Sequence, residues 1–281
     1  MSQVIACIDG SSAATAVVQA ATWSASALAA PLVLFHVLED GHSVAASDMS
    51  GQIGLGSREK LLGELAELDA KRAKLLLEDG YQQLEAAKAL ALASGTIADI
   101  SLRQRHGGLI ESLQALESDT RLLVLGLHGE DDAEHVGSQL ETVLRRIQKP
   151  ILLTPDQFVA PSSVMIAFDG SGSTKKAVEL LAQSPLLRGM PVHVVMVGAE
   201  SESHRAQLQW AQGLLTDAGH QVEVALLAGE VEPALHDYQT QHDIGLLVMG
   251  AYGHSKLRQF FVGSTTTAML AKSKTPLLVL R

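Results

Sequence analysis

Short apolar runs, separated by longer stretches of helical character, recur along the whole chain. In the C-terminal half the apolar runs fall near residues 163–169, 191–197, 222–227, 244–250 and 276–280. Apolar runs of this length, bounded by glycine, proline and polar residues, predict buried strands. Because strands that alternate with helices require right-handed crossovers, the pattern predicts an α/β fold with a parallel sheet and helices on both faces.

The same pattern occurs twice. "VIACIDGSSAAT" from Val4 matches "VMIAFDGSGSTKKA" from Val164 at an offset of 160 residues, and "LLVLGLHG" from Leu122 matches "LLVMGAYG" from Leu246 at an offset of 124. The last strands, "KPILLT" at Lys149 and "TPLLVL" at Thr275, match at an offset of 126. This repeat predicts two tandem domains with open parallel five-stranded sheets, at 1–155 and 161–281, joined by the proline-containing linker 155–163.

The fall in offset from 160 to 124 gives the first copy 36 extra residues, at about 41–78. Within this insertion Leu61, Leu65 and Leu68 recur at helical spacing among charged residues, which predicts an amphipathic helix. Two roles remain open for this helix: it packs on its own sheet, or it forms a surface for a homodimer or for another protein.

Composition and charge exclude several classes of protein. The 281 residues carry a formal net charge of −10, which disfavours binding to nucleic acid and to anionic membrane surfaces. No apolar stretch approaches the roughly 18 residues needed to span a bilayer, and the N-terminus begins with a strand pattern rather than a signal peptide. We therefore expect a cytoplasmic protein without membrane insertion.

Cysteine and histidine usage gives no sign of a metal centre. The single cysteine, Cys7, lies within an apolar run, so we expect a buried core residue and neither an intramolecular disulfide nor a thiolate cluster. The 11 histidines are dispersed without paired ligand spacing. The sequence predicts no metal-binding residues.

The most informative chemistry follows the apolar run 244–250, in "GAYGHSKLRQFFVGSTTT" at 250–267. Gly263 leads into hydroxyl-bearing residues that suit the start of a helix, where free backbone amides and the helix dipole favour an anion. Lys256 and Arg258 lie in the loop, and no acidic residue occurs from 251 to 263. This combination predicts a site for a phosphate chain.

At this point the chain resembles the universal stress protein family. The glycine spacing of the loop, the preceding "DIGLLVMG" and an aspartate at the end of the first strand carry the resemblance, which spans both repeats and is that of a tandem universal stress protein. The resemblance implies a Rossmann-like fold and ATP as ligand, with Mg²⁺ as its companion ion and AMP or ADP as substitutes. It also implies these binding residues: Asp169 at the nucleoside, Val197 at the base, and Gly250, Gly253, Gly263, Ser264 and Thr266 at the phosphates.

Asp169 has a second interpretation, in which it closes an Asx-type turn with Gly170, and Val197 has a second interpretation as plain core. The run "DGSGST" at 169–174 is reminiscent of the SGGxDS loop of ATP pyrophosphatases but lacks the paired glycines and the second aspartate. Adenylating chemistry is therefore poorly supported.

The first copy departs from the family pattern. Gly126, Gly129, Gly137 and Ser138 are present, but "EDDAEHV" at 130–136 shortens the loop and places four carboxylates where the second copy has two basic residues. A polyphosphate would be repelled there unless a divalent cation bridged the charges. We expect a degenerate first site with a solvated acidic loop, and ATP in the second domain alone.

The sequence favours a nucleotide-dependent regulator or sensor in the stress response. Two alternatives remain: a nucleotide-independent interaction scaffold that uses the inserted helix, and a slow ATP hydrolase. No GxxxxGK[ST] P-loop and no evident base for a hydrolytic water occur, so we assign no catalytic residues. The repeat also predicts a pseudo-twofold arrangement and a homodimer of tandem chains.

Overall fold

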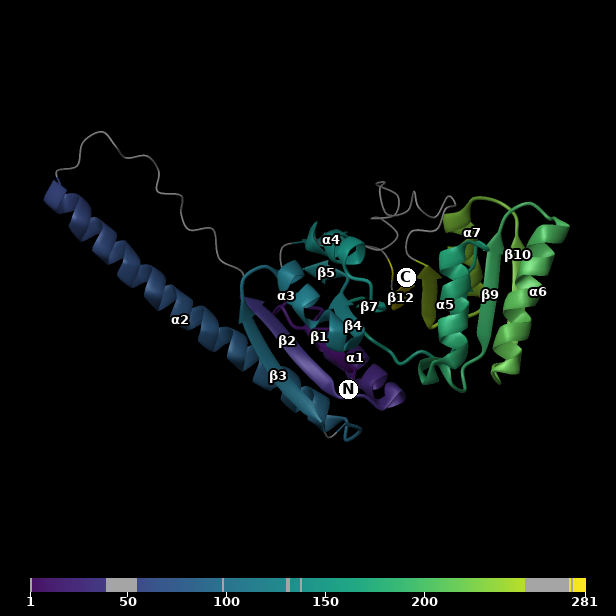
Figure 1. The fold of residues 1–281 in the computed structure, drawn as a ribbon, viewed down its shortest axis with the longest axis horizontal. Coiled ribbons are helices and arrows are strands. Elements are labelled where there is room, and N and C mark those ends of the chain that lie inside the picture. The colour runs from purple at the N-terminus through teal and green to yellow at the C-terminus, as the bar shows by residue number, and fades with distance from the viewer. Residues whose placement is uncertain are drawn as a thin grey trace.

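One ten-stranded sheet runs through the protein. The structure is a computed structural model that describes residues 2–38, 55–97, 99–129, 132–136, 138–250, 273 and 275–281. Among these residues the strand order is β10-β9-β8-β11-β12-β7-β4-β1-β2-β3, so the two repeats form one half of the sheet each (Figure 1).

The first repeat contributes β7-β4-β1-β2-β3, all parallel within the repeat. Its elements in chain order are β1 (Gln3–Cys7), α1 (Ala14–Leu28), β2 (Leu32–Leu38), α2 (Leu55–Ala93), β3 (Ile100–His106), α3 (Leu109–Leu116), β4 (Thr120–Gly126), β5 (His128–Gly129), β6 (Asp132–Val136), α4 (Ser138–Arg146) and β7 (Ile151–Thr154). The segment predicted as a solvated acidic loop differs from that expectation, because β6 pairs with β5 in a short antiparallel ribbon.

The second repeat contributes β10-β9-β8-β11-β12, again parallel. Its elements are β8 (Val164–Ala167), α5 (Gly172–Gln183), β9 (Val192–Val197), α6 (Glu202–Asp217), β10 (Val222–Leu227), α7 (Val231–Gln241), β11 (Leu246–Gly250) and β12 (Leu277–Leu280). Each of the five predicted apolar runs contains one of these strands. The predicted α/β fold class is confirmed.

The two half-sheets join through β7 and β12, which pair antiparallel. The sequence pattern predicted two separate sheets and gave no sign of this junction. At its centre Leu152 lies opposite Leu278, and these two residues are equivalent by the 126-residue offset of the last strands. Because each of these two leucines faces its own counterpart, a local pseudo-twofold axis passes between them.

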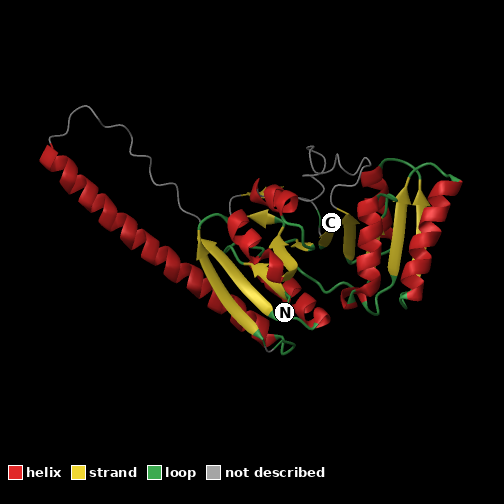
Figure 2. Ribbon diagram, in the orientation of Figure 1, coloured by secondary structure: helices red, strands yellow, loops and turns green. Residues whose placement is uncertain are grey.

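Helices cover both faces of the sheet (Figure 2). On one face α1, α2, α5 and α6 supply buried side chains to a core cluster that includes Leu34, Leu152, Val194 and Leu278. On the other face α3, α4 and α7 cover a second cluster that includes Cys7 and Met165. Both clusters draw residues from both repeats, so neither repeat has a core of its own.

Cys7 behaves as the sequence predicts. It is a free, buried cysteine in the second cluster. Burial, and to a smaller degree the charge of Asp9, raises the pKa of its thiol far above the usual range. The thiolate form needed for metal binding or nucleophilic chemistry is therefore strongly disfavoured.

Helix α2 has two distinct parts. Its C-terminal part packs on the first half-sheet through Gly80, Leu84, Ala87 and Ala91, which are buried and recur at helical spacing. From Gly63 to Asp79, in contrast, every residue is exposed, and this part projects from the molecule (Figure 1). The C-terminal part therefore fits the role of packing on its own sheet, and the exposed part fits the role of a surface for a homodimer or for another protein.

We predict that the continuous sheet unfolds as one unit. Leu278 is 1% exposed, so replacing it by alanine should lower the free energy of unfolding by about 2–5 kcal/mol through lost burial and a cavity. The chain's two tryptophans, Trp23 and Trp210, lie in different repeats and provide local reporters. The Trp210→Phe variant leaves Trp23 as the reporter, and Trp23→Phe leaves Trp210. Fluorescence of the two variants during urea unfolding should give the same urea midpoint, and Leu278→Ala should lower that midpoint equally in both. A shift seen by Trp210 alone would contradict a shared core.

Candidate functional site

Three neighbouring strands of the second repeat bring the described candidate residues to one edge of the sheet. Val197 ends β9, Asp169 follows β8 by two residues, and Gly250 ends β11. β8 pairs with β9 on one side and with β11 on the other, so the ends of these three strands lie side by side. Chain connections from β8 and β11 lead to opposite sides of this point, where ligands bind in open α/β sheets.

The turn after β8 is held by Asp169. Its Oδ1 accepts hydrogen bonds from the backbone amide of Ser171 at 2.9 Å and from the hydroxyl of Thr174 at 2.7 Å. Gly170 has a φ of +72°, a backbone conformation that residues with a Cβ rarely adopt, so this turn favours glycine. The Asx-type turn considered for Asp169 is therefore present.

Hydroxyl groups surround the start of α5 at this edge. Ser171 is the N-cap and accepts a hydrogen bond from the amide of Thr174, and its hydroxyl lies 3.0 Å from that of Ser173. The free amides of a helix N-terminus and these hydroxyls can donate to an anion. The sequence analysis did not assign Ser171, Ser173 or Thr174 to the site. The run "DGSGST" was the available signal, because a hydroxyl-rich segment directly after a strand end fits a helix cap.

Gly250 brings the end of β11 against this helix start. A Cβ at Gly250 would lie 3.0 Å from Cγ2 of Thr174 and 3.4 Å from its backbone nitrogen. The glycine predicted to contact phosphates therefore also allows strand and helix to approach closely. Oε1 of Gln207, which faces Gly170, is buried without a hydrogen-bond partner in the described structure.

Val197 is half-buried at the same edge. It packs against the second core cluster together with Leu227 and Val231, and the following residue, Gly198, donates a backbone hydrogen bond to the carbonyl of Leu227 at 2.8 Å. Its environment agrees with the plain core interpretation, and its partly exposed surface is apolar.

The remaining predicted phosphate residues, Gly253, Gly263, Ser264 and Thr266, lie outside the described residues, as do Lys256 and Arg258. The structure thus brings together Asp169, Val197 and Gly250, and the contacts of the others stay predictions from the sequence.

The equivalent edge of the first repeat has the same turn with less polar chemistry. Oδ1 of Asp9 accepts from the amide and the hydroxyl of Ser11, and Gly10 has a φ of +75°. However, Ala13 and Ala14 stand where the second repeat has Ser173 and Thr174, and α1 begins without a side-chain cap. The hydroxyl-rich helix start is therefore particular to the second repeat.

No helix within the described parts of the chain has the length and apolar character needed to cross a membrane.

Comparisons with known proteins agree with this architecture. The model of the universal stress protein family matches residues 1–155 and 162–281. Universal stress protein Slr1230 of Synechocystis sp. (strain ATCC 27184 / PCC 6803 / Kazusa) is 36% identical over 288 residues, with 100% of both chains covered.

Solved structures show the same fold. The crystal structure of a universal stress protein from Archaeoglobus fulgidus DSM 4304 has a TM-score of 0.69 at 17% identity, covering 99% of this chain and 98% of that chain. A functionally unknown protein from Pseudomonas aeruginosa PAO1 has a TM-score of 0.59 at 15% identity, covering 99% and 92%. With the family model matching each repeat, this chain belongs to the universal stress protein family as a tandem member with two family domains.

Proposed function

We propose that this protein is an ATP-binding regulator or sensor of the stress response that holds one ATP in its second domain. One observation carries the proposal: Asp169, the hydroxyl-rich start of α5 and Gly250 converge where the winding of the second half-sheet reverses. A carboxylate beside amide and hydroxyl donors suits a ligand with both sugar hydroxyls and phosphates.

In this proposal each part of the ligand meets a different chemistry. Asp169 accepts from a ribose hydroxyl, and the half-buried Val197 offers apolar surface to the adenine ring. Gly250, Gly253, Gly263, Ser264 and Thr266 surround the phosphates, with Mg²⁺ as counter-ion. ADP and AMP share the nucleoside and therefore compete for the same site.

The second domain is favoured over the first for two reasons. The helix start in the first domain has Ala13 and Ala14 in place of the hydroxyl-bearing Ser173 and Thr174. Its loop also carries four carboxylates at 130–134, whereas residues 251–263 of the second domain carry no acidic residue. Repulsion of a polyphosphate at the first site and attraction at the second give one ligand per chain.

Binding suits this site better than turnover. Oδ1 of Asp169 already accepts two hydrogen bonds that hold the turn, so this atom serves as a fixed acceptor rather than as a base for water. The proposal is therefore a cytoplasmic nucleotide-dependent regulator, with slow ATP hydrolysis as its alternative.

The exposed part of α2 supports a homodimer. Leu65, Leu68 and Leu75 are 48%, 60% and 67% exposed on a helical segment that packs on nothing else in the described chain. Glu64, Glu67 and Asp69 precede Lys71, Arg72 and Lys74 on this segment, and Glu78 and Asp79 follow at its end. An antiparallel pair of α2 helices centred near Ala70 places the acidic group of each copy against the basic group of the other and covers the leucines. We therefore propose a second copy of this chain as the partner of α2.

For the nucleotide site we predict that calorimetric titration of the nucleotide-free full chain gives one ATP per chain. Asp169→Asn keeps an oxygen for Ser171 and Thr174 but removes the negative charge. Losing one charge-assisted hydrogen bond, at about 1.5–3 kcal/mol, should weaken ATP binding roughly tenfold or more.

The matched control is Asp9→Asn in the first domain, which should leave ATP affinity and stoichiometry unchanged. Two equivalent sites in the wild type, or equal losses for Asp9→Asn and Asp169→Asn, would overturn the assignment to the second domain. Circular dichroism checks that both variants stay folded.

For the assembly we predict a mass by light scattering of twice the chain mass of 29.7 kDa. Leu68→Glu combined with Leu75→Glu should give monomers, because each copy would bring two negative charges, and the pair four, into the interface between the helices. The control Leu92→Glu alters a leucine that is 47% exposed on the docked part of the same helix and should leave the dimer intact. A wild-type monomer at tens of micromolar, or a dimer that survives the double substitution, argues against α2 pairing.

A further inference from the structure

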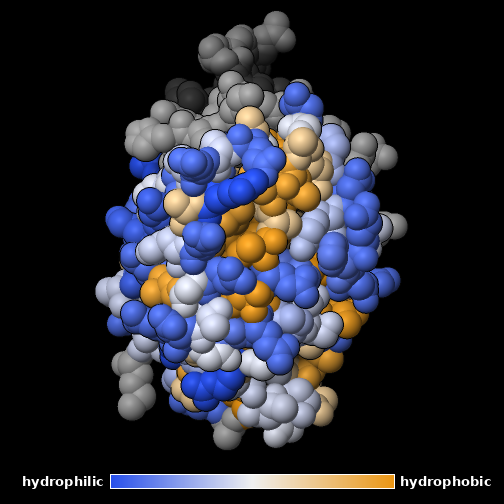
Figure 3. Space-filling model, turned by 90° about the vertical axis from the view of Figure 1, so that its right-hand side faces the viewer, coloured by the Kyte–Doolittle hydropathy of each residue, from blue (hydrophilic) through white to orange (hydrophobic). Residues whose placement is uncertain are grey.

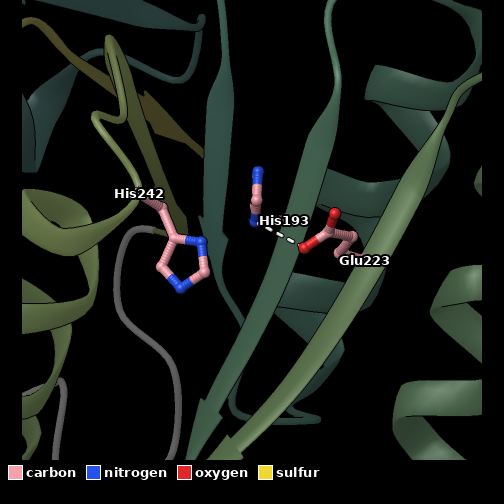
Figure 4. A group of neighbouring side chains, drawn as sticks. All are labelled: His193, Glu223 and His242. Atoms are coloured by element: carbon pink, nitrogen blue, oxygen red, sulfur yellow. Dashed lines mark ion pairs between the residues drawn. The ribbon is translucent and has the colours of Figure 1, made fainter.

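A second cluster of reactive side chains lies away from the nucleotide edge. His193 comes from β9, Glu223 from the neighbouring β10, and His242 from the residue that follows α7 (Figure 4). His193 and Glu223 are direct partners in the register of the two strands, so their side chains emerge on the same face of the sheet. The three residues are far apart in sequence, which explains why the spacing of the histidines gave no sign of them.

The donor atoms of the cluster are close enough for one ion. Each residue offers one ligand atom, and these atoms all lie within 4.8 Å of one another. Nδ1 of His193 lies 3.6 Å from Oε2 of Glu223. Ligand atoms around a tetrahedral zinc ion are about 3.3–3.5 Å apart, given zinc–ligand bonds of about 2.0–2.2 Å. To bind an ion the donor atoms would have to move closer together, and Glu223, whose side chain is 69% exposed, has the freedom to do so.

His193 is held in a buried position on β9, where it is 7% exposed. The hydroxyl of Tyr238 lies 3.0 Å from Nδ1 of His193.

His242 is also held in place. Its ring stacks on Tyr238 with 4.0 Å between ring centroids and 21° between planes, and its backbone amide donates to the carbonyl of Tyr238 at 3.0 Å. The ring centroids of His193 and His242 are 5.3 Å apart. Two imidazoles are thus positioned by separate elements before any ion binds.

The first repeat lacks a histidine at the position of His193. At the equivalent position of the first repeat, 160 residues earlier, His193 is replaced by Val33, which pairs with Ser101 on the next strand and is buried in the apolar cluster. One repeat therefore fills this place with apolar packing, and the other with two histidines and a glutamate.

We propose that His193, Glu223 and His242 bind one divalent transition-metal ion of the zinc class. Two imidazole nitrogens and one carboxylate oxygen form the type of ligand set that zinc takes in three-ligand sites, with water in the fourth position.

The site is separate from the proposed nucleotide site. His193 precedes Val197 by four residues on β9, or roughly 13 Å along the strand, towards the opposite end of the sheet. The ion would connect the edge strand β10, its neighbour β9 and the end of α7. β10 is the edge strand of the second half-sheet, and its Val224 is 37% exposed. Figure 3 shows a hydrophobic strip among hydrophilic residues at this end of the molecule.

The test is calorimetric titration of the nucleotide-free full chain with ZnCl₂, with Co²⁺ as an optical probe of a tetrahedral site. We expect one Zn²⁺ per chain and a visible Co²⁺ absorption band. His193→Val, which copies the first repeat, and His242→Ala should each weaken Zn²⁺ binding at least about tenfold and abolish the band, since a lost ligand leaves only two.

Two controls keep the result specific. His236→Ala removes an exposed histidine on α7 itself and should change nothing, and Tyr238→Phe keeps the stack on His242 and should retain the ion. If His193→Val misfolds, Glu223→Ala at an exposed position gives the same test. The proposal would be overturned if the wild type bound Zn²⁺ no more tightly than His193→Val, His242→Ala or Glu223→Ala. It would also be overturned if the wild type gave no Co²⁺ absorption band.

Discussion

The antiparallel contact between β7 and β12 is the constraint on which the rest of the structure depends. By placing Leu152 against Leu278, it joins two parallel half-sheets into one sheet and allows both core clusters to extend through both repeats. It also sets the two carboxyl edges in opposite directions at the junction. The carboxyl ends of β7 and β12 therefore lie at opposite edges of the sheet, so the proposed nucleotide site of the second repeat would be built without the carboxyl edge of the first.

Within this shared frame the two repeats have different chemistry. The turn after the first strand is the same in both, with Asp9 or Asp169 accepting the amide two residues on. The side chains that follow differ, since alanines in the first repeat replace a serine and a threonine in the second. The same holds at the other end of the sheet, where Val33 stands in place of His193. The fold is retained by backbone geometry and apolar burial, which leaves polar residues free to change in one copy.

Local pattern was sufficient to predict the five strands of the second repeat, the repeat itself and the buried Cys7. These depend on apolar runs and on crossover rules that act over short distances in sequence. The joined sheet was not predictable in this way, because Ile151–Thr154 and Leu277–Leu280 look like ordinary terminal strands. Thr174 and the His193 cluster were not predicted for a related reason. Strand register and the position of helix ends determine which residues they contact, and the spacing of residues along the sequence does not reveal either.

If the second domain alone holds an adenine nucleotide, as we propose, native mass spectrometry of freshly purified protein should detect it, since a ligand bound in the cell is retained and weighed. We expect a mass increment of one ATP, ADP or AMP per chain, and two per homodimer. Two nucleotides per chain, or none in a protein that also fails to take up added ATP, would contradict the proposal.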